Sequence, residues 1–108
     1  MVDMLPYLEG IKKKVSEGSI HKEFETFNKT VFFDFPDIGK QYTLKLTGGK
    51  AELVARKIDQ PDISVTTTSD VLASILDKKI NPVTAYVSRK IKVKGEMQDL
   101  LKLQKLMS

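Results

Sequence analysis

Side chains able to perform acid–base or metal chemistry are few and scattered in this sequence. There is no cysteine, which excludes disulfides, thiolate metal ligands and cysteine nucleophiles. The single histidine, His21, lies at a predicted helix start without an obvious partner, so we interpret it as a solvated side chain. The close acidic pairs, Glu23 with Glu25 and Asp59 with Asp62, are typical of a polar helix face and of a turn.

The motifs of common enzyme classes are not found either. The sequence has no Gly-x-Ser-x-Gly nucleophile elbow, no glycine-rich phosphate loop, no dinucleotide-binding fingerprint and no His-Glu-x-x-His. We therefore predict no catalytic residue, no metal site and no cofactor. The expected function is not enzymatic.

The C-terminal segment, residues 97–107, offers apolar surface instead. A helix that lies on a sheet needs an apolar stripe of only about 100°. On a helical projection the apolar arc covers well over half of the circumference and contains Met97, Leu100, Leu101, Leu103, Leu106 and Met107. The surplus must face a ligand, a second layer of the core or another protomer. Gln104 lies within the arc and, if buried, must bond backbone, water or a ligand headgroup, because an unpaired amide costs about 1 to 3 kcal/mol.

The composition predicts one domain over residues 1–108. Hydrophobic residues make up 41% and charged residues 30% of the chain, which is ordinary for a globular protein. Two separate cores would each be too small to be stable. No apolar run approaches the roughly 20 residues of a membrane span, and the N-terminus lacks the order of a signal peptide. We expect a cytoplasmic protein.

The net charge of +4 is concentrated in the last third of the chain. Residues 77–108 carry eight Lys and Arg against three Asp and Glu. This bias indicates either a solvated face or an attraction to an anionic membrane surface or an acidic headgroup. We do not expect nucleic acid as a partner, because Tyr86 is the only aromatic residue available there for stacking on bases.

Helices are predicted from apolar residues at intervals of three and four. The first covers residues 3–16 with Asp3 as its N-cap, and a second follows Ser19 and includes Phe24 and Phe27. A third begins after a cap at Ser69 or Asp70 and ends near residues 78–79. Asn81 and Pro82 then open a short helix with Ala85 and Tyr86 pointing inward, and residues 97–107 form the last.

Strands are predicted where the apolar period changes to two. They cover residues 30–35, 41–47, 51–58, 63–68 and 91–94. Gly48 and Gly49 form a two-residue hairpin signal, and residues 59–62 form a second turn. Short turns join antiparallel neighbours, whereas the last strand follows a helical crossover that permits a parallel pairing. The prediction is an α+β fold with helices packed on one face of a mainly antiparallel sheet.

The order of motifs in residues 77–106 resembles the sterol carrier protein 2 family. The family has a Gly-Lys-Leu-Asn-Pro-like segment, which corresponds to residues 78–82, followed by an Ala-aromatic pair, which corresponds to residues 85–86. A Lys-Leu-Lys-Ile-x-Gly-like strand comes next and corresponds to residues 90–95, and a helix that starts Met-x-x-x-x-Lys-Leu corresponds to residues 97–103. Two residues depart from the pattern, since Lys78 and Arg89 stand where glycine is expected. If those loops need positive φ, the backbone there is mildly strained.

The resemblance implies a five-stranded sheet, helices on one side, and a lipid held between the layers. It also implies reversible, non-covalent binding of a sterol, phospholipid, fatty acid or fatty acyl-CoA. An apolar tunnel of about 300 to 1,000 Å³ can do this without a polar motif, since each buried methylene contributes about 0.8 kcal/mol.

For the ligand-binding residues we predict Phe24, Phe27, Leu44, Leu46, Val65, Leu72, Ile75, Tyr86, Met97, Leu101 and Gln104. The alternative is a non-catalytic module that uses the same C-terminal helix to form a homodimer or to dock on a partner.

Overall fold

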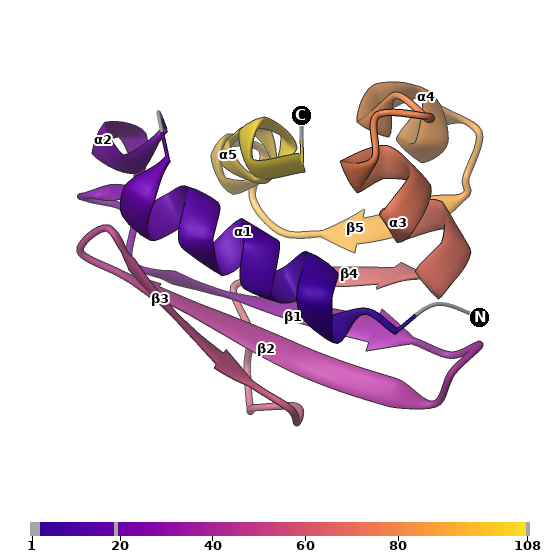
Figure 1. The fold of residues 1–108 in the computed structure, drawn as a ribbon, viewed down its shortest axis with the longest axis horizontal. Helices are drawn as coiled ribbons and strands as arrows, with labels where there is room; N and C mark the ends of the chain where they lie inside the picture. Colours follow the sequence, from indigo (N-terminus) through magenta and orange to yellow (C-terminus); the bar gives the residue numbers. More distant parts are fainter. Residues whose placement is uncertain (1–2, 19, 108) are drawn as a thin grey trace.

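The strands form one sheet in the computed structural model, which describes residues 3–18 and 20–107 (Figure 1). They are β1 (Lys29–Phe35), β2 (Lys40–Thr47), β3 (Lys50–Val54), β4 (Ile63–Thr67) and β5 (Ile91–Lys94). Their order across the five-stranded sheet is β3-β2-β1-β4-β5. The pairs are antiparallel except for β1 with β4, which is parallel. The predicted mainly antiparallel sheet is confirmed.

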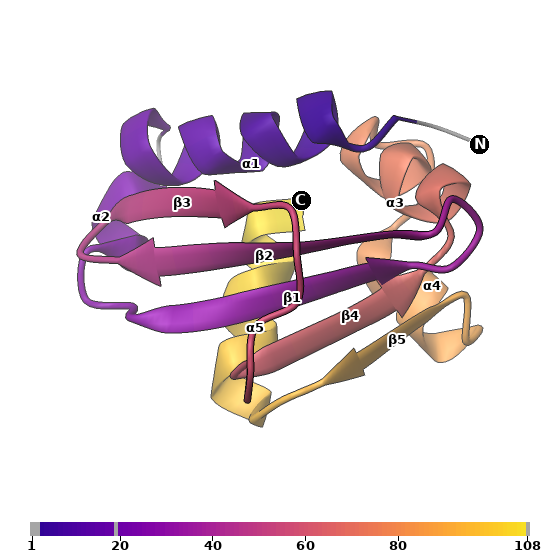
Figure 2. The same cartoon turned by 90° about the horizontal axis from the view of Figure 1, so that it is seen from below.

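The connection from β3 to β4 is where the prediction of strand neighbours was wrong. The third strand ends at Val54 rather than at residue 58, and residues 55–62 cross the face of the sheet that carries no helices (Figure 2). This crossing buries Phe32 and Thr43: the Thr43 hydroxyl donates to the carbonyl of Arg56 at 2.8 Å, and the Lys57 ammonium lies 5.4 Å from the Phe32 ring centroid. The chain therefore bypasses β2, and β4 pairs with β1.

The helices all lie on the other face of the sheet, as predicted (Figures 1 and 2). They are α1 (Leu5–Glu17), α2 (His21–Phe24), α3 (Ser69–Leu76), α4 (Pro82–Val87) and α5 (Met97–Met107). The cap of α3 is Thr68, whose hydroxyl accepts from the backbone N–H of Val71, and not Ser69 or Asp70. The N-cap position of α1 is Met4, although the Asp3 carboxylate accepts from the N–H of Leu5. The predicted cap Ser19 lies outside the described residues.

The second helix is a single turn, which corrects the longer prediction. It ends at Phe24, so Phe27 lies beyond it, yet the two rings still meet edge to face with centroids 5.4 Å apart. Its first residue, His21, is half-buried, and its Nδ1 lies 2.9 Å from the carbonyl oxygen of Val15. The His21 ring also lies against the turn between β2 and β3, where a Cβ atom added at Gly49 would be 2.6 Å from it. Gly48 and Gly49 of that turn both have positive φ, as the hairpin prediction requires. The interpretation of His21 as a residue without a partner was wrong.

The core lies between the sheet and the helices. Its fully buried side chains come from α1, α2, α3 and α5 and from the inward face of the strands; among them are Leu8, Val15, Phe24, Val31, Phe33, Phe35, Leu44, Ile63, Val65, Leu72, Ile75 and Leu106. Phe33 and Phe35 stack with their ring centroids 6.2 Å apart. The space between the central strands and α1 is thus filled by the protein's own side chains.

A carboxylate ties the end of β1 to the start of α3. Asp37 accepts hydrogen bonds from the Ser69 hydroxyl at 2.6 Å and the Ser69 N–H at 2.9 Å, and these bonds lower the pKa of the Asp37 carboxyl below its usual value. A carboxyl whose pKa is lower in the folded than in the unfolded state stabilises the fold at pH values above the unfolded pKa of about 3.9. This contribution is lost as the pH falls through the folded-state pKa. We expect the acid-induced fall in the urea midpoint below about pH 4 to be smaller in Asp37→Asn. Ser69→Ala should reduce it similarly, and an unchanged profile in both variants would contradict this role.

Three turns of the described chain hold non-glycine residues in the left-handed region, at Gln60, Lys78 and Arg89. Lys78 has φ 64° and Arg89 has φ 63°, so both loops require positive φ, as the departures from glycine suggested. This conformation costs an L-residue about 1 to 2 kcal/mol in the folded state. Glycine avoids this cost, but its larger conformational entropy in the unfolded chain offsets up to about 1 kcal/mol of the gain. We expect Arg89→Gly to raise the free energy of unfolding by about 0.5 to 1 kcal/mol in urea titrations.

The neighbouring residue is a matched control for this change. Lys90 is exposed and lacks a positive φ, so Lys90→Gly should lower the free energy of unfolding by about 0.5 to 1 kcal/mol. Equal effects of the two glycine substitutions would show that strain at Arg89 is not released.

Candidate functional site

An apolar groove runs between α4 and α5, and β5 forms its floor. We call it the α4–α5 groove; its volume is about 180 Å³, and it is lined by Pro82, Val83, Tyr86, Ile91, Val93, Met97, Leu100, Leu101, Leu103, Gln104 and Met107. All lining side chains except those of Gln104 and Tyr86 lack hydrogen-bonding groups. The groove is therefore suited to hydrocarbon.

One wall of the groove, α4, is attached lightly to the body of the protein. The Asn81 side chain caps it by accepting from the N–H groups of Val83 and Thr84, as predicted, and Pro82 occupies the first turn. Ala85 is its only buried residue. Tyr86, which the sequence predicted to point inward, is 53% exposed, because in this six-residue helix only the face around Ala85 meets the core.

The other wall, α5, divides its wide apolar arc between two surroundings. Leu103, Leu106 and Met107 are buried in the core, whereas Met97 is 70% and Leu101 is 54% exposed at the mouth of the groove. The surplus of apolar surface expected from the sequence therefore faces the groove and solvent.

Polar contacts fix α5 to the rest of the fold. The buried carboxylate of Asp99 lies 3.5 Å from the Lys29 ammonium. Lys14 donates to the carbonyl of Leu106, and Lys102 donates to the carbonyl of Glu23 at 3.0 Å. These contacts come from β1, α1 and α2, so α5 is held by three other elements, whereas α4 buries only Ala85.

A second cavity adjoins the groove. We call it the Lys78 cavity; its volume is about 270 Å³, and it is lined by Ile75, Lys78, Ile80, Asn81, Pro82, Gln104 and Met107. Pro82, Gln104 and Met107 belong to both spaces and form the partition between them. A third hollow, lined by Gln98, Leu101, Lys102, Gln104 and Lys105, lies along the outer side of α5.

The structure places the predicted site residues in two groups. Tyr86, Met97, Leu101 and Gln104 line the α4–α5 groove, and Ile75 lines the Lys78 cavity. Phe24, Phe27, Leu44, Leu46, Val65 and Leu72 are buried in the core and line none of the three spaces. Only residues of the first group therefore line one of the three spaces, and a ligand contact by the second group stays a prediction.

Sequence reasoning missed seven residues that line the α4–α5 groove: Pro82 and Val83 of α4, Ile91 and Val93 of β5, and Leu100, Leu103 and Met107 of α5. A signal was available for α4: Val83 and Val87 are four residues apart, next to Tyr86, so this short helix has an apolar face in addition to Ala85. These two valines are 46% and 73% exposed. Nothing in the pattern of β5 distinguished a groove floor from an ordinary strand.

The described residues contain no group of three or more His, Cys, Asp or Glu side chains that could hold a metal ion. His21 lies against the turn between β2 and β3 and lines none of the three spaces. Within the described part of the chain, no helix is both long and apolar enough to cross a membrane. The cytoplasmic location stays a prediction.

Comparison with known families decides what kind of fold encloses this groove. Residues 8–108 match the model of the SCP-2 sterol transfer family. The chain belongs to this family. The resemblance seen in the motif order is confirmed, and membership supports lipid binding and transfer in general terms.

Other members of the SCP-2 fold extend the comparison. The sterol carrier protein domain 2 of Helicoverpa armigera superposes with a TM-score of 0.78 at 20% identity, over 96% of this chain and 87% of that one. The palmitated SCP2L2 of Aedes aegypti gives a TM-score of 0.73 at 20% identity, over 93% and 89% of the two chains. At these identities the similarity shows the shared fold.

A curated relative is similar over a shorter segment. Hydroxysteroid dehydrogenase-like protein 2 of Homo sapiens is 38% identical over 50 residues, which are 46% of this chain. The match spans 12% of the length of that relative. The SCP-2 chain described here is thus similar to a small part of a much longer protein.

Proposed function

We propose that residues 1–108 form a single lipid-binding domain that binds and transfers a lipid reversibly, without covalent chemistry. The observation that carries the proposal is the α4–α5 groove, whose lining is almost entirely hydrocarbon. The ligand classes are those of the family resemblance: fatty acid, fatty acyl-CoA, phospholipid or a sterol-like molecule. The palmitated state of the Aedes aegypti neighbour favours an acyl chain among these.

The groove must enlarge to enclose such a ligand. Its volume of about 180 Å³ is below the range of about 300 to 1,000 Å³ that is common for ligand pockets. Joining it to the Lys78 cavity of about 270 Å³ reaches that range, and only Pro82, Gln104 and Met107 separate the two. Methionine adapts its shape readily, and α4 is held mainly through Ala85, so both can move at low cost. We propose that the occupied site is the tunnel formed when these spaces join.

A displacement titration tests the proposal. Purified protein should bind a fluorescent fatty acid saturably with one-to-one stoichiometry, and an unlabelled ligand should displace it. Mass spectrometry of organic extracts from freshly purified protein would identify the natural ligand. Failure to bind fatty acids, acyl-CoA and sterols alike would remove the basis of the proposal.

We also propose that the mouth of the groove contacts an anionic membrane during transfer. Of its lining residues, Val83, Tyr86, Met97 and Leu101 are exposed, and Val87 is exposed next to Tyr86 on α4. Exposed cations from the same third of the chain are Lys78, Lys79, Arg89, Lys90, Lys92, Lys94 and Lys105. Each cation near an anionic leaflet contributes about 1 kcal/mol, and the apolar residues can enter the interface.

Vesicle sedimentation tests the membrane contact. Binding to phosphatidylserine vesicles should exceed binding to phosphatidylcholine vesicles several-fold and should weaken with salt. Val87→Asp should reduce it, whereas Leu5→Asp, at an exposed position on α1, should not. A homodimer that dissociates with Leu101→Arg, in protein without bound lipid, would favour the alternative of a dimerisation module that uses the C-terminal helix.

A further inference from the structure

Lys78 occupies a position where the backbone favours glycine. It follows α3, its N–H donates to the carbonyl of Ile75 at 3.0 Å, and its φ of 64° places it in the left-handed region. A lysine there costs about 1 to 2 kcal/mol relative to an unstrained residue. Residues that retain such strain are often found at functional sites, so we ask what the side chain of Lys78 could bind.

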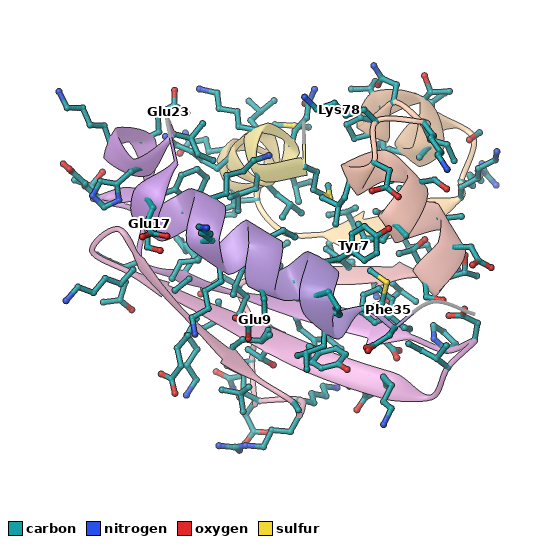
Figure 3. The ribbon with its side chains drawn as sticks, viewed as in Figure 1. Tyr7, Glu9, Glu17, Glu23, Phe35 and Lys78 are labelled. Atoms are coloured by element: carbon teal, nitrogen blue, oxygen red, sulfur yellow. The ribbon has the colours of Figure 1, made fainter. Side chains whose placement is uncertain are left out.

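The Lys78 side chain lines the polar end of the enlarged site. It shares its cavity with Asn81 and Gln104, while the partition residues Pro82 and Met107 lead into the apolar groove. In Figure 3, Lys78 lies between the α3–α4 connection and the C-terminal end of α5. The joined space is therefore hydrocarbon along its length and cationic at this end.

No described residue competes with a ligand for the Lys78 ammonium. Among the described residues, none forms a hydrogen bond or an ion pair with it. The adjacent Asp77 instead accepts from the Tyr7 hydroxyl at 2.7 Å, a bond that raises the pKa of Tyr7. Figure 3 shows Tyr7 reaching from α1 toward α3. The nearest carboxylate in sequence is thus held by another residue.

We propose that Lys78 binds the anionic oxygen atoms of the lipid headgroup, so that this site prefers acidic lipids to neutral lipids of equal chain length. The inference rests on the proposed lipid-binding function. A carboxylate and a phosphate share the required chemistry, since both accept charge-assisted hydrogen bonds from an ammonium group. Asn81 and Gln104 add hydrogen-bonding side chains to the same cavity.

Three ligands with one chain length separate the headgroup from the hydrocarbon. Dodecanoate, dodecyl phosphate and dodecanol are titrated at neutral pH against a bound fluorescent fatty acid, below their micelle-forming concentrations. Wild-type protein should bind at least one of the two anions about ten-fold more tightly than the alcohol. The anion that shows the larger preference distinguishes a carboxylate source from a phosphate source.

Variants assign the preference to one side chain. Lys78→Met should abolish the preference, so that the three ligands bind with similar affinity, and the backbone strain stays the same because methionine also has a Cβ. Lys78→Arg should restore most of the preference. Lys79→Met is the matched control, since Lys79 is exposed and lines none of the three spaces.

The outcomes separate this inference from the function on which it rests. Equal wild-type affinity for all three ligands, or equal losses in the Lys78 and Lys79 variants, would overturn the role of Lys78 and leave lipid binding intact. Failure of wild-type protein to bind any of the three would overturn both.

Discussion

Leu101→Arg is expected to weaken the binding of a fluorescent fatty acid by about 10- to 100-fold while leaving the fold intact. The leucine lies at the mouth of the α4–α5 groove, and burying such a side chain against a ligand contributes about 1.5 to 3 kcal/mol. A guanidinium there would also have to lose water beside the acyl chain. Because Leu101 is 54% exposed in the free protein, the arginine can remain solvated, and the free energy of unfolding should change by less than about 0.5 kcal/mol.

The same substitution at another exposed leucine controls for added charge. Leu5 is 44% exposed on α1 and lines none of the three spaces, so Leu5→Arg should bind the probe like the wild type. Circular dichroism and urea titration check the fold of both variants. If Leu101→Arg binds as tightly as Leu5→Arg, the ligand does not occupy this groove.

Phe24→Ala is expected to lower the free energy of unfolding by about 3 to 5 kcal/mol without changing ligand affinity in the folded fraction. Phe24 is fully buried, packs against Phe27, and has the Lys102 ammonium 5.6 Å from its ring centroid. Removing the ring leaves a cavity that surrounding helices fill only partly. A loss of this size is a large part of the roughly 5 to 15 kcal/mol of a typical domain, and thermal or urea unfolding would detect it.

A smaller substitution keeps this prediction testable if the alanine variant fails to fold. Phe24→Leu retains most of the volume and should cost about 1.5 kcal/mol or less. Both variants should bind the probe within about two-fold of the wild type when corrected for the folded fraction. A selective loss of affinity in Phe24→Leu would instead place the ligand deep between α2 and the sheet.

These two predictions concern residues that the sequence assigned to one site. Phe24 and Leu101 were both predicted to contact the ligand, yet they lie in different surroundings, one in the filled core and one at an open groove. Hydrophobic periodicity reports only that a side chain avoids water. It does not distinguish contact with the core from contact with a ligand, because both surroundings are hydrocarbon.

Local features were predicted well where nearby residues determine them. The Asn81 cap and the glycine turn after β2 follow from backbone sterics and short-range hydrogen bonds. For the loops at Lys78 and Arg89 the sequence left positive φ as one of two possibilities, and the structure has it at both residues. The motif order of residues 77–106 also indicated the family, whose model matches residues 8–108.

The sequence by itself thus determined the order of the elements, the Asn81 cap of α4, the single helical layer and the excess of apolar surface on α5. Only the tertiary structure decided which strand β4 pairs with and where that excess faces. The path of residues 55–62 under the sheet depends on long-range contacts with Phe32 and Thr43, which no local pattern encodes. The groove likewise arises from the spacing between two helices, because an empty space is a property of how elements pack and not of any one of them.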